Sequence, residues 1–216
     1  MTLIHNFVHI KNRGNPAVSG GNIFFDDDDR LRFLFMIIYL QGKKTFPQIN
    51  RHIAKHRLTG NFGVKEKKEK EITTTKLIDL ISFCLTTNQF DLLAKEKSAG
   101  GVAQYIQKIQ NGYTKYFNQK YGRGGHLFAG PYKLVPLNNS DELLRLSAHL
   151  HKKPSVLPNW RGQVDNYPWS SYQDYLIKNR WGTALLSPEP ILEKFIDVTE
   201  YKKFVESLLT DNSFDK

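Results

Sequence analysis

The order of strand-like and helix-like segments constrains the fold of this chain more than any other feature of its sequence. Apolar runs of strand length cover residues 3–11, 77–85, 90–96 and 132–137, and helical periodicity covers residues 28–41, 101–121 and 140–153. The order along the chain is therefore strand, helix, strand, strand, helix, strand, helix. This is the split βαβ arrangement, so we predict an α+β, ferredoxin-like fold with an antiparallel four-stranded sheet. We expect its helices on one face, which would leave the other face available to a partner.

The chain has 216 residues, enough for one domain with a full core and an appended segment. We expect a first domain at residues 1–157 and a mostly helical C-terminal extension at residues 158–216. The extension should contain short amphipathic helices near residues 188–196 and 198–209. No stretch approaches the roughly 18 apolar residues of a membrane helix, so we expect no membrane partner.

Residues 42–75 are polar and include a lysine–glutamate block at residues 65–71. We interpret this stretch as a solvated loop or a frayed helix end. A DNA-contacting arm is the alternative, and it is less favoured because the acidic residues cancel part of the positive charge.

The charge of the chain indicates a polyanionic partner. Lysine and arginine outnumber aspartate and glutamate by 31 to 21, a net charge of +10. Aromatic residues stand among basic ones at residues 113–121, a pattern that suits either stacking on unpaired bases or the core side of a helix. A single cysteine, Cys84, excludes an internal disulfide and a cysteine zinc cluster, and it suits a reducing cytoplasm.

Several short stretches form a recognisable pattern when they are taken together in chain order. They lie at residues 12–14, 23–27, 83–93, 112–118, 125–133 and 168–172. Together they resemble the REP-associated tyrosine transposases, a branch of the HUH superfamily. The resemblance spans most of residues 1–178. It implies a ferredoxin-like fold, binding of short DNA hairpins and cleavage of one strand beside them.

The resemblance also implies a specific chemistry. Two histidines that flank one apolar residue of a strand share a face and hold a divalent metal, Mg²⁺ or Mn²⁺. The metal polarises the scissile phosphate, and a tyrosine on a helix attacks it to form a covalent phosphotyrosine link to DNA. A polar residue four places after the tyrosine, one helical turn along, completes the metal site.

This chain departs from that pattern at each chemical position. Gln89 and Asp91 stand where the two histidines are expected, although their oxygens leave weak Mg²⁺ or Mn²⁺ binding conceivable. His149 stands in the place of the tyrosine, and Lys153 in the place of the helix ligand. A lysine repels a metal ion. Pro131 replaces a basic residue that follows Gly130 in the family pattern.

We therefore interpret the chain as a transposase-like protein that binds single-stranded or hairpin DNA without cutting it. Phosphate contacts are predicted from Lys115, Lys120, Arg123, Lys133, Arg145, Lys152 and Lys153. Whether the chain is an enzyme stays open, because an active nicking transposase could use Gln89 and Asp91 as metal ligands and His149 as nucleophile. A protein-interaction module that reuses the scaffold is the other alternative. The resemblance also implies a homodimer, for which the sequence carries no separate signal.

Overall fold

The computed structural model describes residues 6–44, 48–60, 62 and 66–208. Within them, four strands form one antiparallel sheet in the order β2-β3-β1-β4. The strands are β1 (Phe7–Arg13), β2 (Ile78–Leu85), β3 (Gln89–Glu96) and β4 (Lys133–Pro136). This is the α+β fold expected from the sequence. The first strand ends two residues later than predicted, and the predicted residues 3–5 lie outside the described part.

The helices follow the predicted order, with additions. They are α1 (Asp27–Tyr39), α2 (Ile49–Thr59), α3 (Glu66–Thr74), α4 (Gly101–Lys120), α5 (Ser140–Lys152), α6 (Tyr172–Leu176), α7 (Glu189–Leu192) and α8 (Val198–Ser207). Side chains cap three of the predicted helices, α1, α5 and α8, the last through Asp197, which accepts from the backbone N–H of Glu200 at 2.8 Å. Asp26 Oδ1 accepts from the backbone N–H of Asp29 at 2.9 Å, and Asn139 Oδ1 accepts from that of Glu142 at 2.9 Å.

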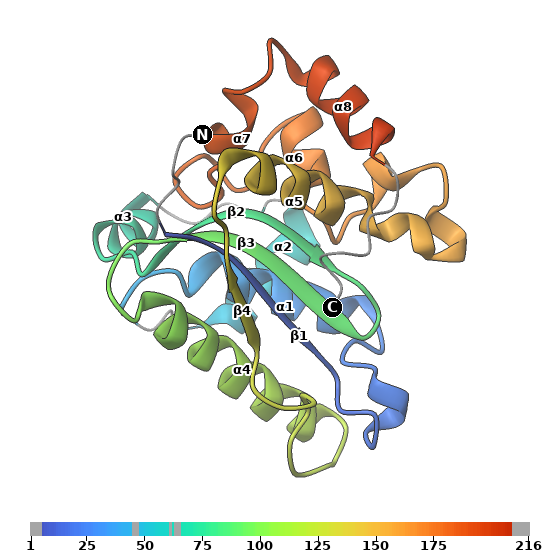
Figure 1. Cartoon of the computed structure of the whole chain (residues 1–216). Coiled ribbons are helices and arrows are strands. Elements are labelled where there is room, and N and C mark those ends of the chain that lie inside the picture. Colours follow the sequence, from blue (N-terminus) through green and yellow to red (C-terminus); the bar gives the residue numbers. More distant parts are fainter. Residues whose placement is uncertain (1–5, 45–47, 61, 63–65, 209–216) are drawn as a thin grey trace.

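Helices α1 and α4 cover one face of the sheet (Figure 1). Val8 and Ile10 of β1 and Phe90 of β3 are buried in the cluster on this side. The ring of Phe33 on α1 lies 5.0 Å from the ring of Phe90. Burying side chains of this size stabilises the fold by about 1.5–3 kcal/mol each, so this layer is a main source of stability.

The opposite face is covered over β2 and β3 by α5 and the C-terminal extension. Ile81, Cys84 and Leu93 are buried in one cluster with Leu146 and Leu150 of α5. Figure 1 shows α5, α6 and α8 gathered on the side of the sheet away from α4. The expectation that this face is left available is therefore wrong over β2 and β3. These two strands carry apolar residues on both faces, so both faces need cover.

The extension also continues the sheet beyond β2. The backbone N–H of Leu85 donates to the carbonyl of Trp169 at 2.9 Å, and that of Ser171 donates to the carbonyl of Phe83 at 3.0 Å. These bonds satisfy backbone groups that an edge strand would otherwise expose. Residues of α5 and of the C-terminal extension pack in one buried cluster. The domain boundary predicted at residue 158 stays a prediction.

The described part of residues 42–75 forms two helices, α2 and α3, rather than the solvated loop or frayed helix end that was expected. Ile49 and Ile53, four residues apart, are buried on one side of α2, and Ile72 is buried on α3. Between the two helices, the ring centre of Phe62 lies 4.4 Å from that of Trp181 in the extension. A few anchored apolar residues are therefore enough to fold this polar stretch as helices.

Candidate nucleic-acid interface

The exposed end of the sheet is built from three neighbouring strands. Alternation along β1 sets His9, Lys11 and Arg13 on one face. The antiparallel register then sets Lys11 opposite Asp91 of β3 and opposite Lys133 of β4. Charged side chains that are distant in sequence thus meet where β1 ends.

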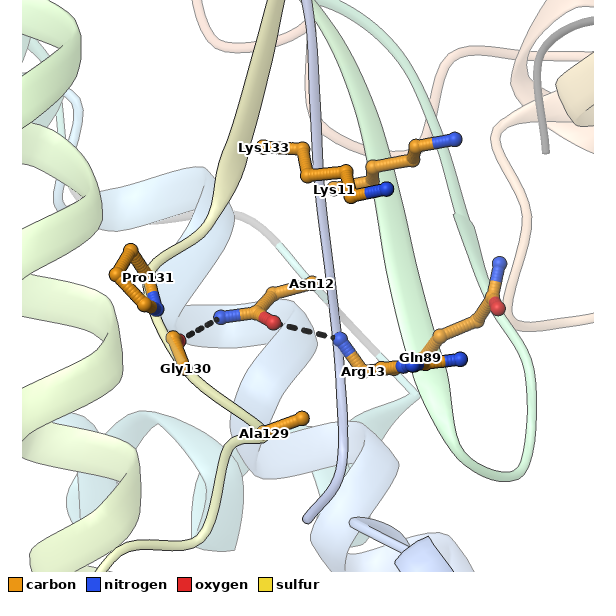
Figure 2. Close-up of a pocket in the computed structure, with 8 residues that line it drawn as sticks. All are labelled: Lys11, Asn12, Arg13, Gln89, Ala129, Gly130, Pro131 and Lys133. Atoms are coloured by element: carbon orange, nitrogen blue, oxygen red, sulfur yellow. Dashed lines mark hydrogen bonds between the residues drawn. The ribbon is translucent and has the colours of Figure 1, made fainter. Parts of the chain in front are cut away.

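A pocket of about 320 Å³ opens at this end, between β1, β3 and residues 129–133. Figure 2 shows the side chains of Lys11 and Lys133 extending to the same side of the sheet, with Arg13 beside Gln89. Among the described residues that line the pocket, Lys11, Arg13 and Lys133 are cationic and none is acidic. Arg13 and Lys133 are exposed, whereas Lys11 is buried. The pocket therefore presents positive charge to solvent mainly through Arg13 and Lys133.

Asn12 fixes the wall of this pocket from the other face of β1. Its Nδ2 donates to the carbonyl of Gly130 at 3.0 Å, and its Oδ1 accepts from the backbone N–H of Arg13 at 2.8 Å (Figure 2). The backbone N–H of Ala129 donates to the carbonyl of Arg13 at 3.0 Å. These bonds hold the segment before β4 against β1, so the pocket is preformed.

A buried ion pair adjoins the pocket at Asp91. The Asp91 side chain is 0% exposed, and Lys153 Nζ donates to its Oδ2 at 2.8 Å. Gln89 Nε2 donates to the same oxygen at 2.8 Å, and His9 Nε2 donates to Oδ1 at 3.0 Å. The structure thus joins three residues for which the sequence predicted separate roles, Gln89 and Asp91 for metal and Lys153 for DNA, and adds His9.

Charge and hydrogen bonding keep Asp91 ionised. Burial alone would raise the pKa of its carboxyl, but the hydrogen bond from His9 and the charge of Lys153 outweigh burial and hold that pKa well below its ordinary value. Asp91 is therefore a carboxylate whose charge the neighbouring ammonium compensates.

The residues at this position do not fit a divalent metal. Both oxygens of Asp91 already accept hydrogen bonds, and the Lys153 ammonium touches the oxygen that a metal would need. Charges of +1 and +2 about 4 Å apart repel by roughly 8 kcal/mol at an effective dielectric constant of about 20. Among the residues that the structure describes, no three His, Cys, Asp or Glu side chains gather closely enough to hold a metal ion.

His149 lies one turn before Lys153 on α5 and is half-buried. The backbone N–H of Lys153 donates to the carbonyl of His149, so both belong to the last turn of the helix. Residues four apart share a helix face. From that face, Lys153 reaches Asp91.

Lys120 does not suit the DNA contact predicted for it. Its ammonium donates to Asp26 Oδ2 at 2.8 Å and to Asp29 Oδ1 at 2.8 Å. Burial alone would lower the pKa of Lys120, but these two carboxylates raise it well above its ordinary value. Two carboxylates already compensate this charge, and we leave Lys120 out of the interface.

Two other predicted phosphate contacts are also engaged within the protein. Lys152 Nζ donates to the carbonyl of Glu206 at 3.0 Å and also to that of Leu208. The guanidinium of Arg123 lies 5.7 Å from the centre of the Phe117 ring, and its Nη2 donates to the carbonyl of Gly124. Lys152 thus ties α5 to the end of α8.

Apart from Lys153, whose side chain is only 9% exposed and pairs with Asp91, the remaining predicted contacts are exposed. Arg145 lies on the solvent side of α5, and Lys133 lines the cationic pocket. Lys115 lines a second hollow of about 750 Å³ between α4 and residues 126–131. The two hollows share residues 129–131 as a wall.

The aromatic run at residues 113–121 belongs largely to the core. Tyr113 and Phe117 are fully buried, and the Tyr113 hydroxyl donates to the carbonyl of Ile23 at 2.6 Å. The Tyr121 hydroxyl donates to Asp29 Oδ2 at 2.7 Å. Of the two interpretations that the sequence left open here, core packing is the one that Tyr113 and Phe117 follow.

Sequence reasoning gave no role to His9, Lys11 or Arg13, although they complete the site. The alternation along β1 predicts that these three side chains share one face of the strand. It does not predict which residues lie beside them, because Asp91 and Lys133 are far away along the chain.

Comparisons with known proteins show a similar fold in one solved structure. No protein-family model matches the chain, and no curated protein matches it. Among solved structures, it is similar to a REP-associated tyrosine transposase bound to a REP hairpin, with a TM-score of 0.50 and 10% sequence identity. That match covers 84% of this chain and 86% of the other. Within the described residues, no helix is both long and apolar enough to cross a membrane.

Proposed function

We propose that this chain is a transposase-like DNA-binding protein that holds single-stranded or hairpin DNA without cutting it. The observation that carries the proposal is the cationic pocket, where Arg13 and Lys133 are exposed and none of the described lining residues is acidic. Guanidinium and ammonium groups bind phosphate oxygens by charge-assisted hydrogen bonds. The hydrogen bonds of Asn12 fix the backbone of the pocket wall next to these groups before DNA arrives.

Two further observations support DNA as the polyanion. The chain carries a net charge of +10. Its fold is similar to that of a REP-associated tyrosine transposase bound to a REP hairpin. We propose that the single cysteine, which is buried at Cys84, reflects a cytoplasmic protein.

The lack of strand cleavage is the finer part of the proposal. A phosphotyrosine link needs a tyrosine, and His149 stands at the matching position. Phosphate activation in the family needs a metal, and the oxygens of Asp91 are engaged by Lys153 and His9. We therefore assign this region to holding DNA rather than to reacting with it.

A binding assay with matched oligonucleotides tests the proposal. Fluorescence anisotropy compares a hairpin, its unpaired strand and a duplex of equal length over a range of salt concentrations. We expect salt-sensitive binding with preference for the hairpin or the single strand. Absence of binding to all three at low salt would refute DNA binding and favour a protein-interaction module.

Cleavage is tested separately on a denaturing gel. The labelled hairpin with flanking single strand is incubated with the protein and Mn²⁺, and with the His149→Ala variant as control. We expect no slow-migrating covalent adduct and no shortened strand. An adduct that His149→Ala abolishes would establish an active transposase with an atypical nucleophile.

A further inference from the structure

The cluster around Asp91, formed with His9, Gln89 and Lys153, contains a buried cation, Lys153, that does not line the cationic pocket. The Asp91 side chain is 0% exposed and that of Lys153 is 9% exposed, with 2.8 Å between ammonium and carboxylate. The pair joins β3 to the residue that follows α5 across 62 positions of sequence. Lysine side chains are seldom this buried without an acidic partner, so the ion pair with Asp91 explains why Lys153 can be buried here.

We infer that the Lys153 ammonium is a built-in replacement for a divalent cation. The positive charge sits directly on Asp91 Oδ2, with His9 on Oδ1 and Gln89 beside it. Imidazole, carboxylate and amide oxygen are all donors that Mn²⁺ accepts. The native chain is thus metal-independent because a covalently attached cation holds the metal's place.

The ligand set differs from a histidine pair on one strand. His9 comes from β1, whereas Gln89 and Asp91 come from β3, and the two strands are paired in a continuous antiparallel register. Paired strands hold their side chains at nearly fixed separations. Rotation of the Gln89 amide by half a turn would present its oxygen instead of its Nε2. Three donors therefore converge, and the Lys153 ammonium keeps a metal away from them.

Removal of that ammonium should create affinity for metal. In Lys153→Asn, a neutral oxygen donor replaces the cation and the Asp91 carboxylate is left uncompensated. We expect Mn²⁺ to raise the unfolding midpoint of this variant by about 5 °C or more once it is about a hundredfold above its Kd. The midpoints of the native protein and of the neighbouring control Lys152→Asn should not respond to Mn²⁺.

A second variant separates the carboxylate from general effects. Asp91→Asn combined with Lys153→Asn removes both charges, so it should fold without metal and show no response to Mn²⁺. If Lys153→Asn is unfolded in EDTA, the inference requires Mn²⁺ to refold it. An equal Mn²⁺ response in native and Lys153→Asn proteins would overturn the inference, and so would a folded Lys153→Asn that ignores Mn²⁺.

The readout is metal binding by the full chain in the absence of DNA. A negative result would therefore leave the DNA-binding proposal intact. Conversely, a chain that binds no DNA would still show the Mn²⁺ response in Lys153→Asn.

Discussion

Replacing the two exposed cations of the pocket should weaken the salt dependence of DNA binding by an amount that can be calculated. We choose Arg13→Gln combined with Lys133→Gln, because both side chains are exposed at the rim. Glutamine keeps much of the length of each side chain and removes its charge. Lys11 is left in place, since it is buried and its removal would disturb the sheet.

The magnitude follows from counterion release. Each phosphate contact contributes about 0.7 to the slope of log K against log salt on single-stranded DNA, and about 0.9 on a duplex. Two lost contacts lower the slope by about 1.4 on a single strand. Over a fourfold rise in salt, a slope of 1.4 corresponds to a factor of about seven in affinity.

Anisotropy titrations of the labelled unpaired strand between about 50 and 200 mM salt measure this slope. The matched control is Arg161→Gln with Lys203→Gln, which removes two exposed charges from the C-terminal extension. We expect the pocket variant to lose slope and the control to keep it. An equal loss in both variants would show that net charge, and not the pocket, governs binding.

Further predictions concern buried polar groups. Burial lowers the pKa of His151 from 6.5 to about 3. His151 is therefore protonated at a higher pH in the unfolded chain than in the folded one. As pH falls from about 6.5 toward 3, the free energy of unfolding should drop by about 1.4 kcal/mol per pH unit. Urea unfolding at several pH values measures this drop, and His151→Gln should flatten it; an unchanged pH dependence would exclude His151 as its source. Lys120→Met should cost about 1–2 kcal/mol in the same assay, because the buried carboxylate of Asp29 loses a cation. It should leave the salt slope of DNA binding unchanged, and a reduced slope would return Lys120 to the interface.

The fold was predictable where local pattern decides it. The alternation of β1 and the apolar spacing along α4 are visible in the sequence, and the order of elements then selects the topology. The helices α2 and α3 were missed because few apolar residues mark them. Ile53 and Ile72 are buried by neighbouring elements, and the contact of Phe62 with Trp181 joins distant segments. Tertiary packing, not local propensity, stabilises these helices.

The sequence identified three residues of the site but not the contacts between them. The positions of Gln89, Asp91 and Lys153 came from the resemblance, and they do meet. Nothing local indicated that Lys153 would neutralise Asp91, because the two are 62 positions apart. The cover of the second face by the extension was likewise invisible, since it depends on how α5 packs on β2 and β3.

The affinity of the native protein for hairpin DNA, measured in EDTA and again in Mn²⁺, tests most directly whether the chain binds DNA with its own fixed charges. We expect the same Kd in both conditions at matched ionic strength, with no covalent product. Binding that requires Mn²⁺ would contradict the account in which protein cations take the place of a metal at this site, and no binding in either condition would contradict the proposal that the chain binds DNA.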